Sequence, residues 1–282
     1  MSFLYLFAKR FVAGEELEEA VPSIKVLNEK GIMVTFDHLG ENVNTEQEAT
    51  AAADSYLQIL EVIQRESLKS NVSLKLTQMG LDLGDEFCLR NVERIVKKAK
   101  EIDNFVRIDM EGSTYTQRTL DITFKLFEQY KNVGVVIQAM LLRSESDIKE
   151  LIKRGIRVRL CKGAYKEPES VAYQKKEQVN ENYKKLMKML LKEGNYPAIA
   201  THDENMIEEA KRFIEENKID KSRFEFQMLY GIRRDLQELL ARDGYNMRVY
   251  VPYGKEWFPY FYRRLRERKE NLFFVMKNFF KG

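Results

Sequence analysis

The sequence predicts an α/β fold, a (β/α)8 barrel of the TIM type. Three observations support this prediction: eight short apolar runs, amphipathic stretches between them, and a length of 282 residues that suits one barrel domain. Strands that alternate with helices imply a parallel sheet with right-handed crossovers. The alternative is an open doubly wound sheet, but the chain contains neither GxGxxG nor GxxxxGK[ST].

The elements follow one another along the chain without a linker or a break in composition. The expected strands are 32–37, 72–76, 105–110, 133–140, 156–161, 198–202, 224–229 and 247–252. The expected helices carry apolar residues at three- and four-residue spacing and lie at 46–67, 91–101, 116–130, 144–154, 171–191, 204–216 and 233–241. We expect one catalytic domain over 1–282, with a short helical segment (1–30), the barrel (31–270) and a tail (271–282).

Composition excludes several classes of protein. The 47 basic and 44 acidic residues give a net charge of +3, which is too balanced to indicate a nucleic-acid partner. Cys88 and Cys161 lie far apart, which fits a reducing cytosol and predicts no metal site. No apolar run is long enough to span a bilayer, so a cytoplasmic location is expected. The aromatic end at 272–280 predicts core packing or weak peripheral contact with a membrane.

In such a barrel, functional residues lie where strands end at the carboxyl face. Lys75 and Asp109 interrupt apolar runs at two strand ends, and they are read as an active-site pair, a Schiff-base lysine or a structural ion pair. In RLCKGAY (159–165), Gly163 allows close backbone approach beside the positive charge of Arg159 and Lys162. This pattern favours an anionic cofactor over an ordinary turn with solvated bases.

The segment 250–267 is the most informative stretch. Arg263 and Arg264 are adjacent on a predicted helix, and Glu267 is three residues further on, where it can orient Arg264. Two guanidinium groups beside tyrosines suit a small apolar molecule with a carboxylate, and the alternative is a solvated basic helix. His202 at another strand end favours a hydrogen bond to a cofactor, whereas His38 is expected to be structural.

These motifs, in this order, resemble the proline dehydrogenase family from roughly Phe11 to Glu267. The resemblance is carried by DxLGE (37–41), Lys75, Asp109, IQA (137–139), RLxKGAY (159–165), TH (201–202), EFQML (225–229), and YVPYG with RRLxE (250–267). It implies FAD as cofactor, L-proline as substrate, Δ1-pyrroline-5-carboxylate as product and a membrane quinone as electron acceptor. It also implies a distorted barrel whose last helix lies over the carboxyl face.

The resemblance also implies roles for individual residues at the substrate site. Arg263, Arg264 and Lys75 would bind the proline carboxylate, Glu267 would orient the arginines, and Asp109 would neutralise Arg263 or Lys75. Glu41 would pair with Arg263 as a gate. The pocket walls would be Leu229, Tyr250 and Tyr260, with Tyr250 crowding out a ring hydroxyl.

The flavin site is implied in the same way. Arg159 would lie at the flavin N5 and Gln138 at the pyrimidine edge. The remaining cofactor residues would be Val136, Lys162, Gly163, Ala164, Thr201 and His202. No residue stands out as a general base, and no metal is implied.

Other readings stay open at this point. They are a methylenetetrahydrofolate reductase-like flavoenzyme, a Schiff-base aldolase that uses Lys75 or Lys162, and an inactive relative that binds a ligand. The oligomeric state is also open.

Overall fold

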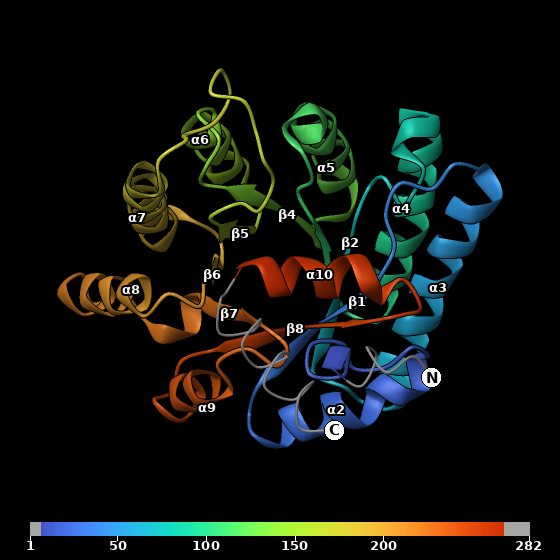
Figure 1. The fold of residues 1–282 in the computed structure, drawn as a ribbon, viewed down its shortest axis with the longest axis horizontal. Coiled ribbons are helices and arrows are strands. Elements are labelled where there is room, and N and C mark those ends of the chain that lie inside the picture. The colour runs from blue at the N-terminus through green and yellow to red at the C-terminus, as the bar shows by residue number, and fades with distance from the viewer. Residues whose placement is uncertain (1–6, 268–282) are drawn as a thin grey trace.

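The computed structural model describes residues 7–267. For residues 265–267 it describes the backbone alone. Its eight parallel strands form a closed barrel in sequence order (Figure 1). They are β1 (Met33–His38), β2 (Ser70–Leu74), β3 (Val106–Ile108), β4 (Val133–Gln138), β5 (Val158–Cys161), β6 (Ala198–Ala200), β7 (Glu225–Leu229) and β8 (Met247–Tyr253). The barrel closes where β8 pairs with β1, from Met33 opposite Arg248 to His38 opposite Tyr253. The predicted (β/α)8 architecture is confirmed.

Helices surround the barrel and bury their apolar faces against it. They are α2 (Leu17–Glu29), α3 (Glu46–Arg65), α4 (Asp85–Glu101), α5 (Thr116–Tyr130), α6 (Ser144–Arg154), α7 (Lys176–Glu193), α8 (Glu204–Glu216) and α9 (Arg234–Arg242), and a further helix, α10 (Trp257–Glu267), follows β8. Most begin and end within two residues of the predicted bounds.

Two helix starts differ from the prediction. Helix α4 begins at Asp85 rather than 91, since Gly84 adopts φ 153 and two acidic residues favour the first turn. Helix α7 begins at Lys176 rather than 171. The residues before it are held in a loop by backbone bonds from Leu142 N–H to the Val171 carbonyl and from Tyr173 N–H to the Met140 carbonyl.

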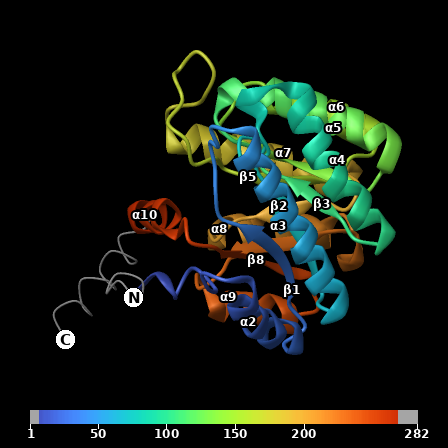
Figure 2. The same cartoon turned by 90° about the vertical axis from the view of Figure 1, so that its right-hand side faces the viewer.

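Helix α10 lies across the carboxyl end of the barrel rather than on its outer wall (Figures 1 and 2). An apolar cluster of Ala8, Phe11, Val12, Leu39, Ile232, Trp257, Tyr260 and Phe261 joins it to the N-terminal segment. The indole N–H of Trp257 donates to Glu15 at 2.9 Å, and Gly254 N–H donates to the Gly14 carbonyl at 2.9 Å. The start of α10 is therefore fixed by residues from the opposite end of the described chain.

The amino half of the barrel interior also holds buried charges. Arg248 Nε lies 2.9 Å from Glu225, and Arg107 donates to the carbonyl of Arg157 at 2.6 Å. Glu225 compensates the charge of Arg248, whereas Arg107 is held by the backbone carbonyls of Val135 and Arg157. They occupy the barrel floor, away from the strand ends where functional residues are expected.

Within residues 7–267, no helix combines the length and the apolar character that crossing a bilayer requires. The predicted tail (271–282), its membrane contact and the first six residues of the predicted helical segment (1–30) lie outside the described residues.

Candidate active site

Polar side chains converge where the strands end at the carboxyl face. Asp37 is on β1, Lys75 and Asp109 directly follow β2 and β3, Arg159 is on β5, and Tyr250 is on β8. All of them except the partly exposed Asp109 are buried. The barrel therefore brings together charges that lie far apart in sequence.

Asp109 is the centre of a hydrogen-bond network. Its Oδ1 accepts from Arg159 Nη1 at 2.8 Å and from the Ser73 hydroxyl at 2.6 Å, and its Oδ2 accepts from the Tyr250 hydroxyl at 2.8 Å. Its hydrogen-bond partners are thus Arg159, Ser73 and Tyr250. Its charge also attracts Lys75, one of the two predicted partners, without a direct contact. Burial, followed by repulsion from Asp109, raises the pKa of Tyr250 well above its ordinary value, so this hydroxyl stays a donor.

Lys75 is a buried cation with carboxylates around it. Its Nζ lies 3.6 Å from Asp37 Oδ2, and the side chains are only 10% and 0% exposed. Burial alone would lower the pKa of Lys75, but attraction to Asp37 and Asp109 outweighs burial and raises it. A Schiff-base lysine must be a neutral amine. The environment of Lys75 therefore disfavours the aldolase reading for this residue.

Arg263 and Glu41 form an ion pair above this network, with Nη1 and Oε1 3.0 Å apart. Burial opposes the charge of Arg263, but Glu41 outweighs burial and raises the pKa of the guanidinium. The pair borders a cavity of about 500 Å³ that Lys75 and Tyr260 also line. The ion pair joins α10 to the loop after β1.

Arg264 is only 8% exposed, and its guanidinium carbon lies 5.0 Å from the centroid of the Tyr260 ring. This burial excludes the alternative in which the double-arginine helix is solvated. The predicted contact of Glu267 with Arg264 lies outside the described side chains.

The turn after β5 has a backbone conformation that favours glycine. Gly163 adopts φ 108, and a Cβ at this position would lie 2.4 Å from Met140 Sδ. Lys162 Nζ pairs with Asp203 at 2.7 Å, and Asp203 N–H donates to the Thr201 hydroxyl at 3.1 Å. Residues 162, 163 and 201 are therefore held in one tight corner between β5 and β6.

Several predicted flavin residues lie next to this corner. Arg159 is buried, and its Nε and Nη2 have no hydrogen-bond partner in the described part of the chain. Gln138 donates to the Glu111 carbonyl at 2.8 Å. His202 accepts the Leu229 N–H at 2.9 Å through Nε2, so this nitrogen supports β7. The unsatisfied guanidinium donors of Arg159 fit a polar, anionic group such as a flavin nucleotide.

The strand-end rule singles out Asp37 and Glu111, but the sequence gives neither of them a role. Glu111 accepts the Thr77 N–H at 3.0 Å and the Thr77 hydroxyl at 2.6 Å. One site residue was missed. Tyr56 donates to Asp37 at 3.1 Å from a helix whose pattern predicts ordinary core packing, so the sequence held no signal.

His38 and Cys161 carry no reactive group into the site. Burial lowers the pKa of His38, whose ring centroid lies 5.1 Å from that of Tyr253. Burial raises the pKa of Cys161 to about 12, so its thiol stays protonated at neutral pH. Among residues 7–267, no cluster of three or more histidine, cysteine or acidic side chains could hold a metal ion.

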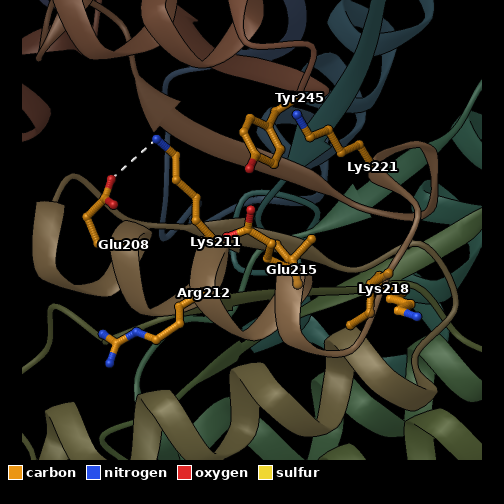
Figure 3. Close-up of a pocket in the computed structure, with 9 residues that line it drawn as sticks. Glu208, Lys211, Arg212, Glu215, Lys218, Lys221 and Tyr245 are labelled. Carbon is orange, nitrogen blue, oxygen red and sulfur yellow. Dashed lines mark ion pairs between the residues drawn. The ribbon is translucent and has the colours of Figure 1, made fainter.

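A second cavity of about 670 Å³ lies on the outer surface beside α8 (Figure 3). Lys211 pairs with Glu208 at 3.3 Å there, and Lys221 stands 4.1 Å from the centroid of the Tyr245 ring. Lys221 and Tyr245 precede β7 and β8, so the groove is at the amino ends of the strands. Its position separates it from the carboxyl-face network.

The fold and the carboxyl-face network define a barrel enzyme with a cationic, largely buried site beneath its last helix. Comparison with known proteins gives the family. The sequence profile described as proline dehydrogenase matches residues 20–277. The chain belongs to the proline dehydrogenase family.

Individual relatives agree with this assignment. Proline dehydrogenase 1 of Bacillus subtilis subsp. natto is 44% identical over 276 residues, which are 98% of this chain and 91% of the relative. Proline dehydrogenase of Deinococcus radiodurans is 42% identical over 284 residues, covering 99% and 92%. Among solved structures, proline utilization A (PutA) from Bdellovibrio bacteriovorus, inactivated by N-propargylglycine, superposes with a TM-score of 0.86 at 28% identity. That alignment covers 93% of this chain and 32% of the PutA chain.

Proposed function

We propose that this protein oxidises L-proline to Δ1-pyrroline-5-carboxylate with bound FAD and delivers the electrons to a membrane quinone. Family membership makes the chain an oxidoreductase that acts on proline, in proline catabolism. The observation that carries the finer proposal is the cluster of three cations at the carboxyl face, namely the buried Lys75 and Arg264 and the partly exposed Arg263.

The three cations support binding of the substrate carboxylate. Lys75 and Arg263 line one cavity, and Arg264 is buried on the same helix as Arg263. Charge-assisted hydrogen bonds from guanidinium to carboxylate are roughly twice as strong as neutral ones. Binding at several points fixes the ring in one orientation, which reduces the entropy cost of reaching the transition state.

Glu41 supports a gating role. It joins the loop after β1 to Arg263, and both side chains remain partly exposed at the rim of the cavity. When Arg263 turns to a substrate carboxylate, this ion pair must weaken or rearrange. The loop that carries Glu41 would then respond to substrate.

Aromatic and apolar side chains support selection of an unsubstituted ring. Tyr250 is 8% exposed and is held by Asp109, while Leu229 lies directly beside it in the β7–β8 register. Tyr260 lines the cavity from α10. A fixed ring at Tyr250 would crowd a hydroxyl on the substrate ring.

The residues present fit FAD. Arg159 and Gln138 would hold the flavin ring system beside Val136, and Lys162, Gly163, Ala164, Thr201 and His202 would hold the rest of the cofactor. When bound, FAD supplies the acceptor for the hydride that leaves C5 of proline. Arg159 would stabilise the negative charge that this transfer creates, because a fixed buried cation needs no reorganisation.

The substrate amine must be neutral when hydride leaves. Lys75 stays protonated and does not serve as the base. The cations at the carboxylate lower the pKa of the substrate ammonium, so water suffices to accept its proton.

A cytoplasmic location with peripheral contact at the inner face of the membrane would bring the reduced enzyme to its quinone. This part of the proposal rests on family resemblance.

The visible absorption spectrum before and after addition of proline tests the proposal. The protein reconstituted with FAD should be yellow, and anaerobic proline should bleach the flavin band. A protein whose FAD proline leaves unbleached, but whose chemically reduced flavin is reoxidised anaerobically by methylenetetrahydrofolate, would be a reductase of that other class. A colourless protein that borohydride links to its substrate would be a Schiff-base enzyme. Flavin that no substrate bleaches would indicate an inactive relative.

A further inference from the structure

We propose that Asp37 is a positioning residue for Lys75, which holds the lysine ammonium charged and directed toward the substrate carboxylate. This inference rests on the proposed function, because that function assigns Lys75 to the carboxylate. Asp37 itself is fully buried and would not touch the substrate.

Asp37 is held in place by a hydrogen bond on the side of its carboxylate that faces away from Lys75. Its Oδ1 accepts the hydroxyl of Tyr56 at 3.1 Å, and Tyr56, fully buried on α3, also accepts the His38 N–H at 3.3 Å. The other oxygen, Oδ2, faces Lys75 Nζ at 3.6 Å. This separation is longer than a hydrogen bond, so the attraction does not use up one of the ammonium donors.

The neighbouring carboxylates are committed to other partners. Asp109 accepts from Arg159, Ser73 and Tyr250. Glu41 pairs with Arg263, and Glu111 accepts from Thr77. In the described structure, Asp37 is the carboxylate within ion-pair distance of Lys75.

The charge of Lys75 depends on such a counter-ion because a buried lysine without one loses its proton at neutral or alkaline pH. The surroundings of the pair also contain other ionisable groups. These are the carboxylates Asp109, Glu41 and Glu111, the cations Arg159 and Arg263, and His38, Tyr56, Tyr165, Tyr250 and Tyr253. Burial lowers the pKa of His38 and raises that of each tyrosine, so these groups stay neutral between pH 7 and pH 9.5.

The test measures binding of a carboxylate by the FAD-loaded protein, not turnover. Tetrahydrofuran-2-carboxylate carries the ring and carboxylate of proline, but its ring oxygen does not titrate. Its Kd would be measured by calorimetry from pH 7 to pH 9.5. Because Lys75 stays charged in the native protein, we expect a flat profile.

Asp37→Asn keeps the shape and the acceptor for Tyr56 but removes the charge. Removing the largest of the attractions that raise the pKa of Lys75 lowers that pKa. The Kd should therefore rise toward pH 9.5, by up to about tenfold for each pH unit above the new pKa. Glu256→Gln is the matched control, since it removes a carboxylate of the same cavity that is not among those raising the pKa of Lys75, and its profile should stay flat. Lys75→Met should bind the analogue weakly at every pH. Adding Asp37→Asn to Lys75→Met should raise the Kd by less than about twofold.

A flat profile for Asp37→Asn, or an equal loss when Lys75 is already Met, would overturn the inference. Native protein that binds neither proline nor the analogue at any pH would instead refute the proposed function. Should Asp37→Asn be insoluble, Tyr56→Phe loosens the same carboxylate and should give a smaller alkaline rise in Kd, about threefold at pH 9.5. A flat profile for that variant would count equally against the role of Asp37.

Discussion

The hydroxyl of Tyr250 donates a hydrogen bond of 2.8 Å to Oδ2 of Asp109, which ties β8 to the residue that follows β3. The other oxygen of this carboxylate accepts from Arg159. One carboxylate thus orients both a proposed substrate wall and a proposed flavin contact. A substitution at Tyr250 or at Arg159 should therefore alter the position of the other side chain.

Tyr250→Ser should relax discrimination against 4-hydroxyproline, since it removes the ring that would crowd the hydroxyl. Tyr250→Phe keeps the ring and loses only the bond to Asp109, so its preference should stay close to native. The ratio of kcat/KM for proline and 4-hydroxyproline measures this. Equal ratios in the native protein and the serine variant would make Tyr250 purely structural.

Arg264→Met should raise the KM for proline strongly. Loss of a charge-assisted hydrogen bond costs about 1.5–3 kcal/mol, or roughly 10- to 150-fold. Arg212→Met on the outer face of α8 is the matched control and should leave KM unchanged. An Arg264→Met enzyme with native KM would remove this residue from the carboxylate site.

Glu41→Gln should change proline binding by a smaller factor. Its pair with Arg263 is about one-third exposed, so the electrostatic contribution is at most about 1 kcal/mol after screening by solvent. Steady-state KM and its dependence on salt would be compared with Glu256→Gln. Glu256 lines the same cavity and forms no ion pair with Arg263 in the described structure. A gate predicts that only Glu41→Gln changes the salt dependence.

Arg159→Met should make bound FAD harder to reduce, because the anionic reduced flavin loses a buried cation. A loss of about 1.4–2.8 kcal/mol corresponds to a midpoint potential lower by roughly 30–60 mV. Arg157→Met is the control, since its guanidinium packs over the Phe105 ring at 5.1 Å, at the other end of β5. Spectroelectrochemistry would measure the midpoint potential of FAD in both variants. A potential in Arg159→Met equal to that of the control would show that Arg159 does not stabilise the reduced flavin.

Phe11→Ala should loosen α10 without touching the proposed flavin residues. Phe11 is fully buried and lies 6.1 Å from the ring centroid of Phe261. Truncation of such a side chain costs about 3–5 kcal/mol, concentrated here on the docking of α10. KM should rise while FAD affinity holds. Phe258→Ala changes a half-exposed ring on the same helix and should do neither.

The fold could be predicted because the strands of a parallel barrel are largely apolar and the outer helices are amphipathic. These periods appear directly in the sequence. The exceptions were helix starts such as Asp85 and Lys176, where a glycine conformation or loop hydrogen bonds decide the boundary.

The site could be predicted only in part. Strand ends identified Lys75, Asp109 and Arg159, since topology alone brings such residues together. Pairing depends on which side chains face each other across the barrel, and the sequence does not contain that information. Asp109 therefore pairs with Arg159 rather than Lys75, and Tyr56 enters from a helix with an ordinary core pattern.

The docking of α10 on residues 8–16 also bears on how the molecule is made. Trp257 and Glu15, which touch across this junction, are 242 positions apart in sequence. Contacts of such separation form late, because the intervening chain must be ordered before its ends meet. A nascent chain on the ribosome therefore contains Lys75, Asp109 and Arg159 well before Arg263 and Arg264 can take their places over the barrel. The site becomes able to retain a carboxylate only when the barrel has closed.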